Sequence, residues 1–85
     1  MDEELRSLRK EIDALDRGIL TQVEKRVETA QKIGAIKAKK GLDISDPARE
    51  KEVLENASKA TKLEKTFVKK LFSSIIEYCK DAEKK

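Results

Sequence analysis

An apolar side chain recurs every three or four positions from Leu5 to Ile36, with no proline in between. This spacing places the apolar residues on one face of an α-helix, and it predicts a single helix over about residues 3–40. The helix is expected to end at Lys39-Lys40-Gly41, because cations followed by glycine are typical of a helix C-terminus. It would be about 55 Å long at about 1.5 Å per residue, whereas a compact domain of this size spans about 30 Å. Either the helix kinks or its protruding half packs on another chain, and we favour an intertwined homodimer.

The remaining sequence predicts two shorter helices. Asp46-Pro47 provides a side-chain cap followed by a proline suited to the first turn, so the second helix is placed at about 46–60. The third is placed at about 64–84, where Phe, Val, Leu and Ile residues recur at helical spacing up to Cys79. The face that the second helix is expected to bury consists of Val53, Leu54, Ala57 and Ala60. We expect an all-α fold, with three helices in a single domain of residues 1–85.

The charge of the chain is high but evenly mixed. Charged residues make up 44% of the sequence, and 20 basic against 17 acidic residues leave a net charge of +3. Disorder is the alternative for so polar a chain, but a disordered segment does not keep a helical register. The small, dispersed excess of cations does not favour nucleic-acid binding. No apolar stretch approaches the roughly 20 residues of a membrane span. We therefore expect a cytoplasmic protein that binds neither membranes nor nucleic acid.

The residue types present exclude several kinds of catalysis. Without histidine and with one cysteine, the chain has too few ligands for a zinc or iron–sulfur site, and it cannot form a Ser/His/Asp or Cys/His nucleophile. Its glycines are isolated, so there is no glycine-rich phosphate loop. What remains is a set of cations with a few carboxylates. Such a set can bind an anion, orient it and stabilise negative charge that develops on it.

Arg26 and Lys37 are the leading candidates for such a site. They lie on the same helical face, with Ala30 and Ile33 between them. Charges on an otherwise apolar face are costly unless they are paired or bind a ligand. The alternative is that both are long side chains at the edge of an apolar stripe, with their charged ends in solvent. Arg9 lies on the same stripe but half a helix away, so it could join Arg26 only from the other chain of a dimer.

The other candidates each have an ordinary structural explanation. Arg49 and Glu50 fall in the first turn of the second helix, where free backbone N–H groups favour anions, but an exposed ion pair explains them equally well. Asp46 is expected to be the helix cap. Cys79 by default is a small buried apolar residue, and Glu83 near the C-terminus an exposed carboxylate.

The order of these residues resembles the all-helical class of chorismate mutase. The resemblance is carried by Leu8-Arg9-x-x-Ile12-Asp13-x-x-Asp16-x-x-Ile19-Leu20, Arg26, Ile33-Gly34-x-x-Lys37, Asp46-Pro47-x-Arg49-Glu50 and Phe72-x-x-Ile75-Ile76-Glu77. Each segment alone is weak, but their joint order and spacing are specific and cover most of the chain. The resemblance implies an interlocked dimer of three-helix chains with two active sites. It also implies the unimolecular rearrangement of chorismate to prephenate, in phenylalanine and tyrosine biosynthesis, without a cofactor or metal.

The resemblance also implies a role for each site residue. The partner's Arg9 joins Arg26 in binding the two carboxylates of chorismate. Lys37 donates to the ether oxygen, which gains negative charge as the C–O bond breaks. Glu50 and the backbone at Asp46 hold the ring hydroxyl group. Together these contacts would select the compact conformer of a flexible dianion and stabilise its polarised transition state.

Arg49 is implied as a supporting cation, whereas two substrate-binding positions depart from the common pattern. Cys79 stands where many relatives have serine or asparagine, and a thiol is a weaker hydrogen-bond donor. Glu83 stands where many relatives have glutamine as a second donor to the ether oxygen.

We expect Glu83 to assist only when it is protonated, because a carboxylate would repel the negative charge that grows on the ether oxygen. Activity should then fall as the pH rises from mildly acidic to neutral and above, and Glu83→Gln should flatten this dependence. The measurement is the initial rate of chorismate conversion by both proteins across this pH range. An unchanged profile in the variant would refute the assignment.

Two other functions are open from the sequence. A non-catalytic helical dimer could bind an acidic partner through its basic stripe. A nucleic-acid-binding dimer would need a continuous basic face or stacking aromatics, and two Phe and one Tyr on an apolar stripe provide neither. Since 85 residues leave no room for a second catalytic domain, we expect a stand-alone homodimeric enzyme.

Overall fold

The computed structural model describes residues 2–85 and consists of three helices. Helix α1 spans Asp2–Lys40, α2 spans Pro47–Lys59 and α3 spans Lys65–Glu83. The structure has no strand within residues 2–85. The predicted all-α fold is confirmed, and each predicted helix boundary lies within one residue of the observed one.

The ends of the helices have local causes. Gly41 adopts a φ of +67°, a left-handed conformation that glycine accepts without strain. The N–H groups of Gly41 and Leu42 then donate to the carbonyls of Ala38 and Lys37, over 3.4 and 2.9 Å. These two bonds form the motif that commonly ends a helix at glycine. At the start of α2, the Asp46 carboxylate accepts from the backbone N–H of Arg49 over 3.1 Å.

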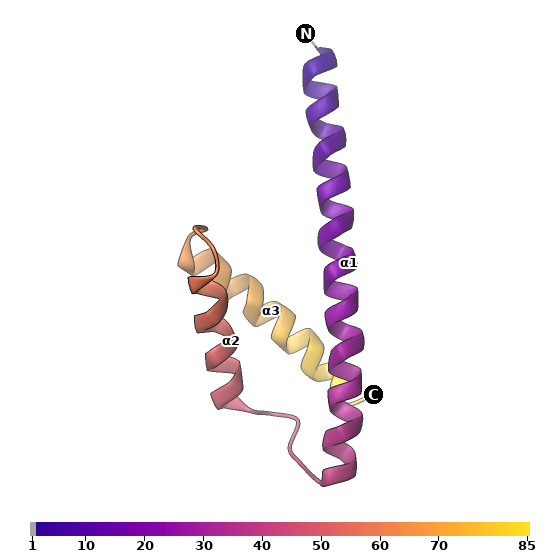
Figure 1. The fold of residues 1–85 in the computed structure, drawn as a ribbon, viewed down its shortest axis with the longest axis vertical. Coiled ribbons are helices and arrows are strands. Elements are labelled where there is room, and N and C mark those ends of the chain that lie inside the picture. The colour runs from indigo at the N-terminus through magenta and orange to yellow at the C-terminus, as the bar shows by residue number, and fades with distance from the viewer. Residues whose placement is uncertain (1) are drawn as a thin grey trace.

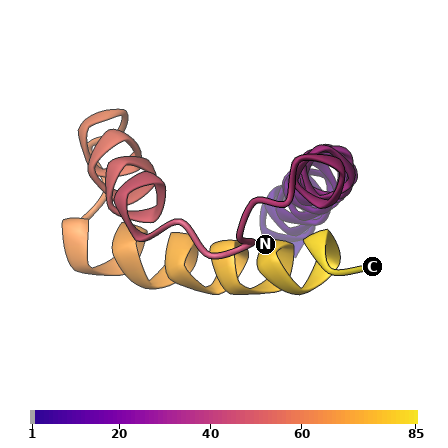
Figure 2. The same cartoon turned by 90° about the horizontal axis from the view of Figure 1, so that it is seen from below.

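Helix α3 packs against both of the other helices, whereas α1 and α2 do not pack against each other in the described part of the chain. Seen from below in Figure 2, α1 and α2 stand apart on the same side of α3. The buried apolar residues are few, and most of them lie on α3: Ala30, Val68, Ile76, Cys79 and Ala82.

The N-terminal part of α1 extends well beyond the other two helices (Figure 1). The molecule measures 60 × 25 × 15 Å, and its radius of gyration is 16.6 Å, against about 12 Å for a compact chain of this length. Every residue from Asp2 to Gln22 is exposed. The large apolar side chains on this half are among them: Leu8 at 53%, Ile12 at 55%, Leu15 at 63% and Ile19 at 60% of their surface.

The expected buried face of α2 was partly wrong. Val53, Leu54 and Ala57 are half-buried, but Ala60 is exposed because it is the C-cap, where its N–H closes the last turn onto the carbonyl of Asn56. Ser58 is buried in its place and donates from its hydroxyl to the carbonyl of Leu54 over 2.8 Å, which satisfies the polar group. None of the helices in residues 2–85 has an apolar stretch long enough to cross a membrane.

Candidate active site

A pocket of about 450 Å³ is lined by residues of α1, α2, α3 and the segment that joins α1 to α2. It brings together seven of the eight site residues predicted from the sequence: Arg26, Lys37, Asp46, Arg49, Glu50, Cys79 and Glu83. Ala30, Ile33, Val53 and Ile76 supply apolar wall between them. The charged side chains thus surround a partly apolar space of a size suited to a small anionic molecule.

Arg26 and Lys37 reach the pocket from the same face of α1, as their spacing predicts. Arg26 is half-buried and donates from Nη1 to the Sγ atom of Cys79 over 3.0 Å. Sulfur is a weak acceptor, so a carboxylate in the pocket would be a stronger partner for this guanidinium. The weak contact with Cys79 therefore orients Arg26 and can be replaced by a stronger hydrogen bond to a ligand carboxylate.

Lys37 is half-buried in the wall of the pocket. Its ammonium donates to the backbone carbonyl of Ile44 over 2.9 Å and to Oε1 of Glu83 over 2.8 Å. The side chains of Lys37 and Glu83 are only 18% and 12% exposed, so their ion pair is largely removed from solvent. Lys37 lies near the C-terminal end of α1 and Glu83 is the last residue of α3, so their ion pair links these two helices. The structure places Glu83 inside the pocket wall rather than at a solvent-exposed end.

The start of α2 contributes the polar wall opposite α1. Asp46 caps the helix through Arg49 N–H, and the backbone N–H of Glu50 donates to the carbonyl of Asp46 over 3.0 Å. The Arg49 side chain is 61% exposed and pairs with Glu52 on the helix surface, so its charge is shared with a residue outside the pocket. Glu50 is half-buried and turned toward α3.

Lys80 also lines the pocket and was not among the site residues predicted from the sequence. Its Nζ atom lies 3.3 Å from Oε2 of Glu50 and 3.6 Å from Oε1 of Glu77. The spacing could have indicated that Lys80 faces the site, because it is four residues after Ile76 and three before Glu83, on one face of α3. It was overlooked because a lysine in a lysine-rich helix is ordinarily a solvent-exposed residue.

Arg9 is the predicted site residue that the structure does not bring to the pocket. It is exposed on the free half of α1, about 25 Å along the helix axis from Arg26 at about 1.5 Å per residue. The lining residues that one chain supplies comprise four cations, with Lys80 included, and three carboxylates. The pocket of a single chain thus carries a net charge of only +1.

Gly34 determines how closely α3 approaches α1. A Cβ atom at this position would lie 2.8 Å from the Cα and 2.9 Å from the carbonyl carbon of Glu83, with the carbonyl oxygen closer still. We expect Gly34→Ala to push the end of α3 away from Lys37 and to cost about 1–3 kcal/mol of folding stability, as overpacking does. Thermal unfolding followed by circular dichroism measures the effect, and an unchanged melting temperature would contradict the close approach.

The fold and the pocket define a small all-helical protein whose cationic site suits an anionic molecule. The sequence profile of the family described as chorismate mutase type II matches residues 8–84. Chorismate mutase from Methanocaldococcus jannaschii is 33% identical over 87 residues, which cover 99% of this chain and 88% of that protein. The chain belongs to the chorismate mutase type II family, whose activity is that of an isomerase.

Two further relatives extend this result. A bifunctional chorismate mutase/prephenate dehydratase from Aquifex aeolicus is 37% identical over 89 residues, which cover 98% of this chain but 25% of the relative. This chain therefore spans about a quarter of the length of that protein. The structure of chorismate mutase form II from Thermus thermophilus superposes with a TM-score of 0.92 at 31% identity, covering 96% of both chains. The comparisons do not support the alternative of a non-catalytic helical module.

Proposed function

We propose that this protein converts chorismate into prephenate by a unimolecular rearrangement that needs no cofactor. The observation that carries the proposal is the convergence of Arg26 and Lys37 with Glu50 and Glu83 on one pocket, in a chain of the chorismate mutase type II family. The reaction requires neither proton transfer nor a covalent intermediate. A pocket built from cations, carboxylates and apolar wall therefore contains the kinds of group that the reaction uses.

Each side chain has a specific task in this proposal. Arg26 binds a substrate carboxylate in place of its present weak bond to Cys79. Lys37 donates to the ether oxygen, where negative charge grows in the transition state, so its contribution is larger there than in the ground state. Glu50 and the backbone at Asp46 hold the ring hydroxyl group, and Arg49 adds positive charge at the edge of the pocket.

We further propose that two copies interlock and that each supplies Arg9 to the pocket of the other. The free half of α1 carries an apolar stripe with no cover in its own chain, and burying a side chain such as Leu or Ile is worth about 1.5–3 kcal/mol. A second, mainly apolar groove of about 610 Å³ lies between the middle of α1 and α3 and ends at Arg26. Its apolar lining includes Leu15, Ile19, Val23, Leu71, Phe72 and Ile75.

The proposed occupant of this groove is α1 of the second copy. An α1 lying there would bury its own apolar stripe against that of the first chain and bring Arg9 beside Arg26. Arg9 would raise the charge of the pocket from +1 to +2, which matches the two carboxylates of chorismate. The dimer thus accounts for both the uncovered stripe and the charge that one chain lacks.

The direct test is the loss of chorismate in the presence of the purified protein, followed by absorbance, with identification of prephenate as the product. Arg26→Ala at the same concentration is the control for a contaminating enzyme, because the variant should retain only the uncatalysed rate. Wild-type protein that is folded and dimeric but leaves chorismate to decay at the rate seen in buffer would contradict the proposal.

A further inference from the structure

Lys80 is a pocket cation to which the proposed mechanism assigns no task. Its side chain is 21% exposed and lies between two carboxylates, that of Glu50 on α2 and that of Glu77 one turn earlier on α3. Glu50 is 29% exposed and lines the pocket, whereas Glu77 is 71% exposed and does not. Lys80 therefore links α3 to the α2 wall of the pocket through a side-chain ion pair.

The electrostatics of Lys80 are dominated by Glu50. Its close side-chain contact with the Glu50 carboxylate, and then the charges of Glu50 and Glu77, raise the pKa of Lys80 above its ordinary value of 10.5, while partial burial opposes the rise. Lys80 thus remains a cation throughout the physiological pH range. Its charge is available to balance that of Glu50.

The Glu50 carboxylate has unused acceptor capacity. Its Oε2 atom is shielded from solvent and receives no aligned hydrogen bond from any described residue, although the Lys80 ammonium lies 3.3 Å away. Carboxylate oxygens accept several hydrogen bonds, and Glu50 lines the pocket, so its carboxylate can also accept a hydrogen bond from a ligand there. The hydroxyl group of the proposed substrate is such a donor.

The Glu50 carboxylate would weaken the binding of a dianion if no cation balanced its negative charge. In the pocket, Lys37 is already paired with Glu83, and Arg49 is paired with Glu52 outside it. Without Lys80, Glu50 would present a negative charge to a substrate that itself carries two, and like charges at close range in a partly desolvated site oppose binding.

We propose that Lys80 is a positioning residue that neutralises Glu50 and fixes its carboxylate, so that this acceptor can bind the substrate hydroxyl without repelling the substrate carboxylates. The inference rests on the proposed function. Lys80 itself does not contact the substrate. Lys80 affects substrate binding only through Glu50, whereas Arg26 and Lys37 contact the substrate directly in the proposed mechanism.

A double-mutant cycle tests the inference with Lys80→Met, Glu50→Gln and the two combined. The readouts are KM and kcat for chorismate, and the Kd of prephenate measured by calorimetry, which does not depend on turnover. In the wild-type background we expect Lys80→Met to raise KM and Kd about tenfold, with a smaller change in kcat. In the Glu50→Gln background the same substitution should change Kd by less than about twofold, because no charge remains to be balanced.

Two variants serve as controls. Lys80→Arg keeps the cation and should bind prephenate within about twofold of the wild type. Glu77→Gln removes the exposed partner of Lys80 and should leave KM and kcat unchanged, because it does not alter the contact with Glu50. Circular dichroism of each protein identifies any variant that binds weakly because it is not folded.

The outcomes separate this inference from the function on which it rests. Wild-type protein that does not convert chorismate would overturn both. An active wild type together with a Lys80→Met variant of unchanged Kd would overturn only the role of Lys80. A tenfold weaker Kd in both backgrounds would also overturn it, because Lys80 would then contact the substrate directly.

Discussion

Replacing Lys37 by alanine is expected to lower kcat for chorismate about 10²–10³-fold, which corresponds to the loss of one charged donor at a developing oxyanion. The ammonium is largely enclosed, and it holds Glu83 and the carbonyl of Ile44 as well as facing the pocket. Its loss removes the donor to the ether oxygen and also the cation that pairs with Glu83. Initial rates at saturating chorismate measure the effect.

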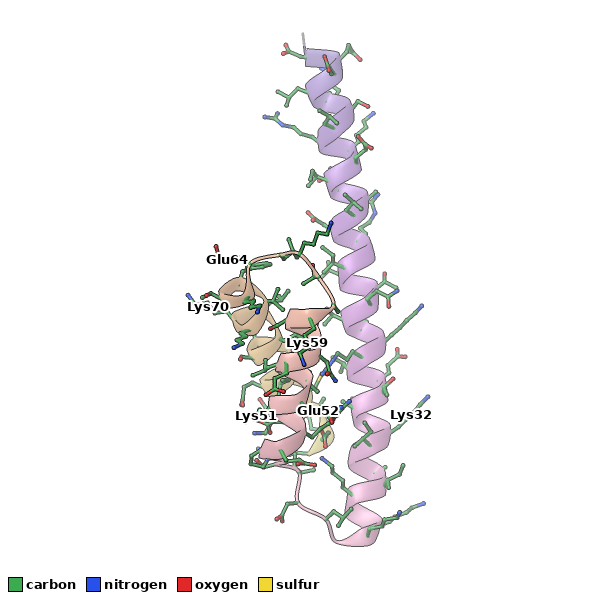
Figure 3. The ribbon with its side chains drawn as sticks, turned by 60° about the vertical axis from the view of Figure 1, so that its left-hand side comes forward. Lys32, Lys51, Glu52, Lys59, Glu64 and Lys70 are labelled. Carbon is green, nitrogen blue, oxygen red and sulfur yellow. The ribbon has the colours of Figure 1, made fainter. Side chains whose placement is uncertain are left out.

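Lys32→Ala is the matched control for this prediction. It is the same chemical change on the same helix, but Lys32 is exposed and points away from α2 and α3 (Figure 3). We expect the kcat of this variant to equal that of the wild type. Lys37→Gln adds a second comparison, because it keeps a hydrogen-bond donor but carries no charge. Equal kcat values for the wild type and Lys37→Ala would exclude Lys37 from the chemistry.

Mixing two inactive variants is expected to restore activity if each pocket takes Arg9 from the other chain. Arg9→Ala and Arg26→Ala should each lower activity by at least about 10²-fold as separate proteins, since each removes a guanidinium from both pockets. A heterodimer of the two has one pocket that lacks both arginines and one that has both. Random exchange makes half of the dimers mixed, so activity should return to about a quarter of the wild-type value.

The experiment requires the chains to exchange, which refolding the two variants together from denaturant achieves. Refolding each variant alone is the control for recovery of activity by refolding itself. If Arg9 served the pocket of its own chain, every heterodimer would contain two defective pockets and no activity would return. A monomeric wild type that converts chorismate would likewise contradict the exchange of Arg9.

The three helices could be predicted from the sequence because their causes are local. The apolar period, the Asp46-Pro47 start and the Gly41 stop each act within a few residues, and all three reappear in the structure at the expected positions. The shared face of Arg26 and Lys37 follows from the same periodicity. Once α1 is known to be a helix, the meeting of these two side chains at one pocket requires only that another element cover that face.

The parts that could not be predicted depend on contacts between distant segments. Nothing near Gly34 in the sequence indicates that the last residue of α3 will lie against it, since that depends on how α3 crosses α1. The pairing of Lys80 with Glu50 likewise depends on the placement of α2 over α3. The position of Arg9 in the pocket depends on a second chain, so it stays a prediction that the exchange experiment tests.

The uncovered N-terminal half of α1 has a consequence for how this protein responds to dilution. Residues 2–22 are exposed throughout, and a lone helical segment of this length is only marginally stable in water. In the proposed dimer, this half of α1 becomes stably helical only when the second chain binds. Helix formation and dimerisation therefore both depend on protein concentration. Helix content, melting temperature and turnover per chain should then all decline together as the protein concentration is lowered.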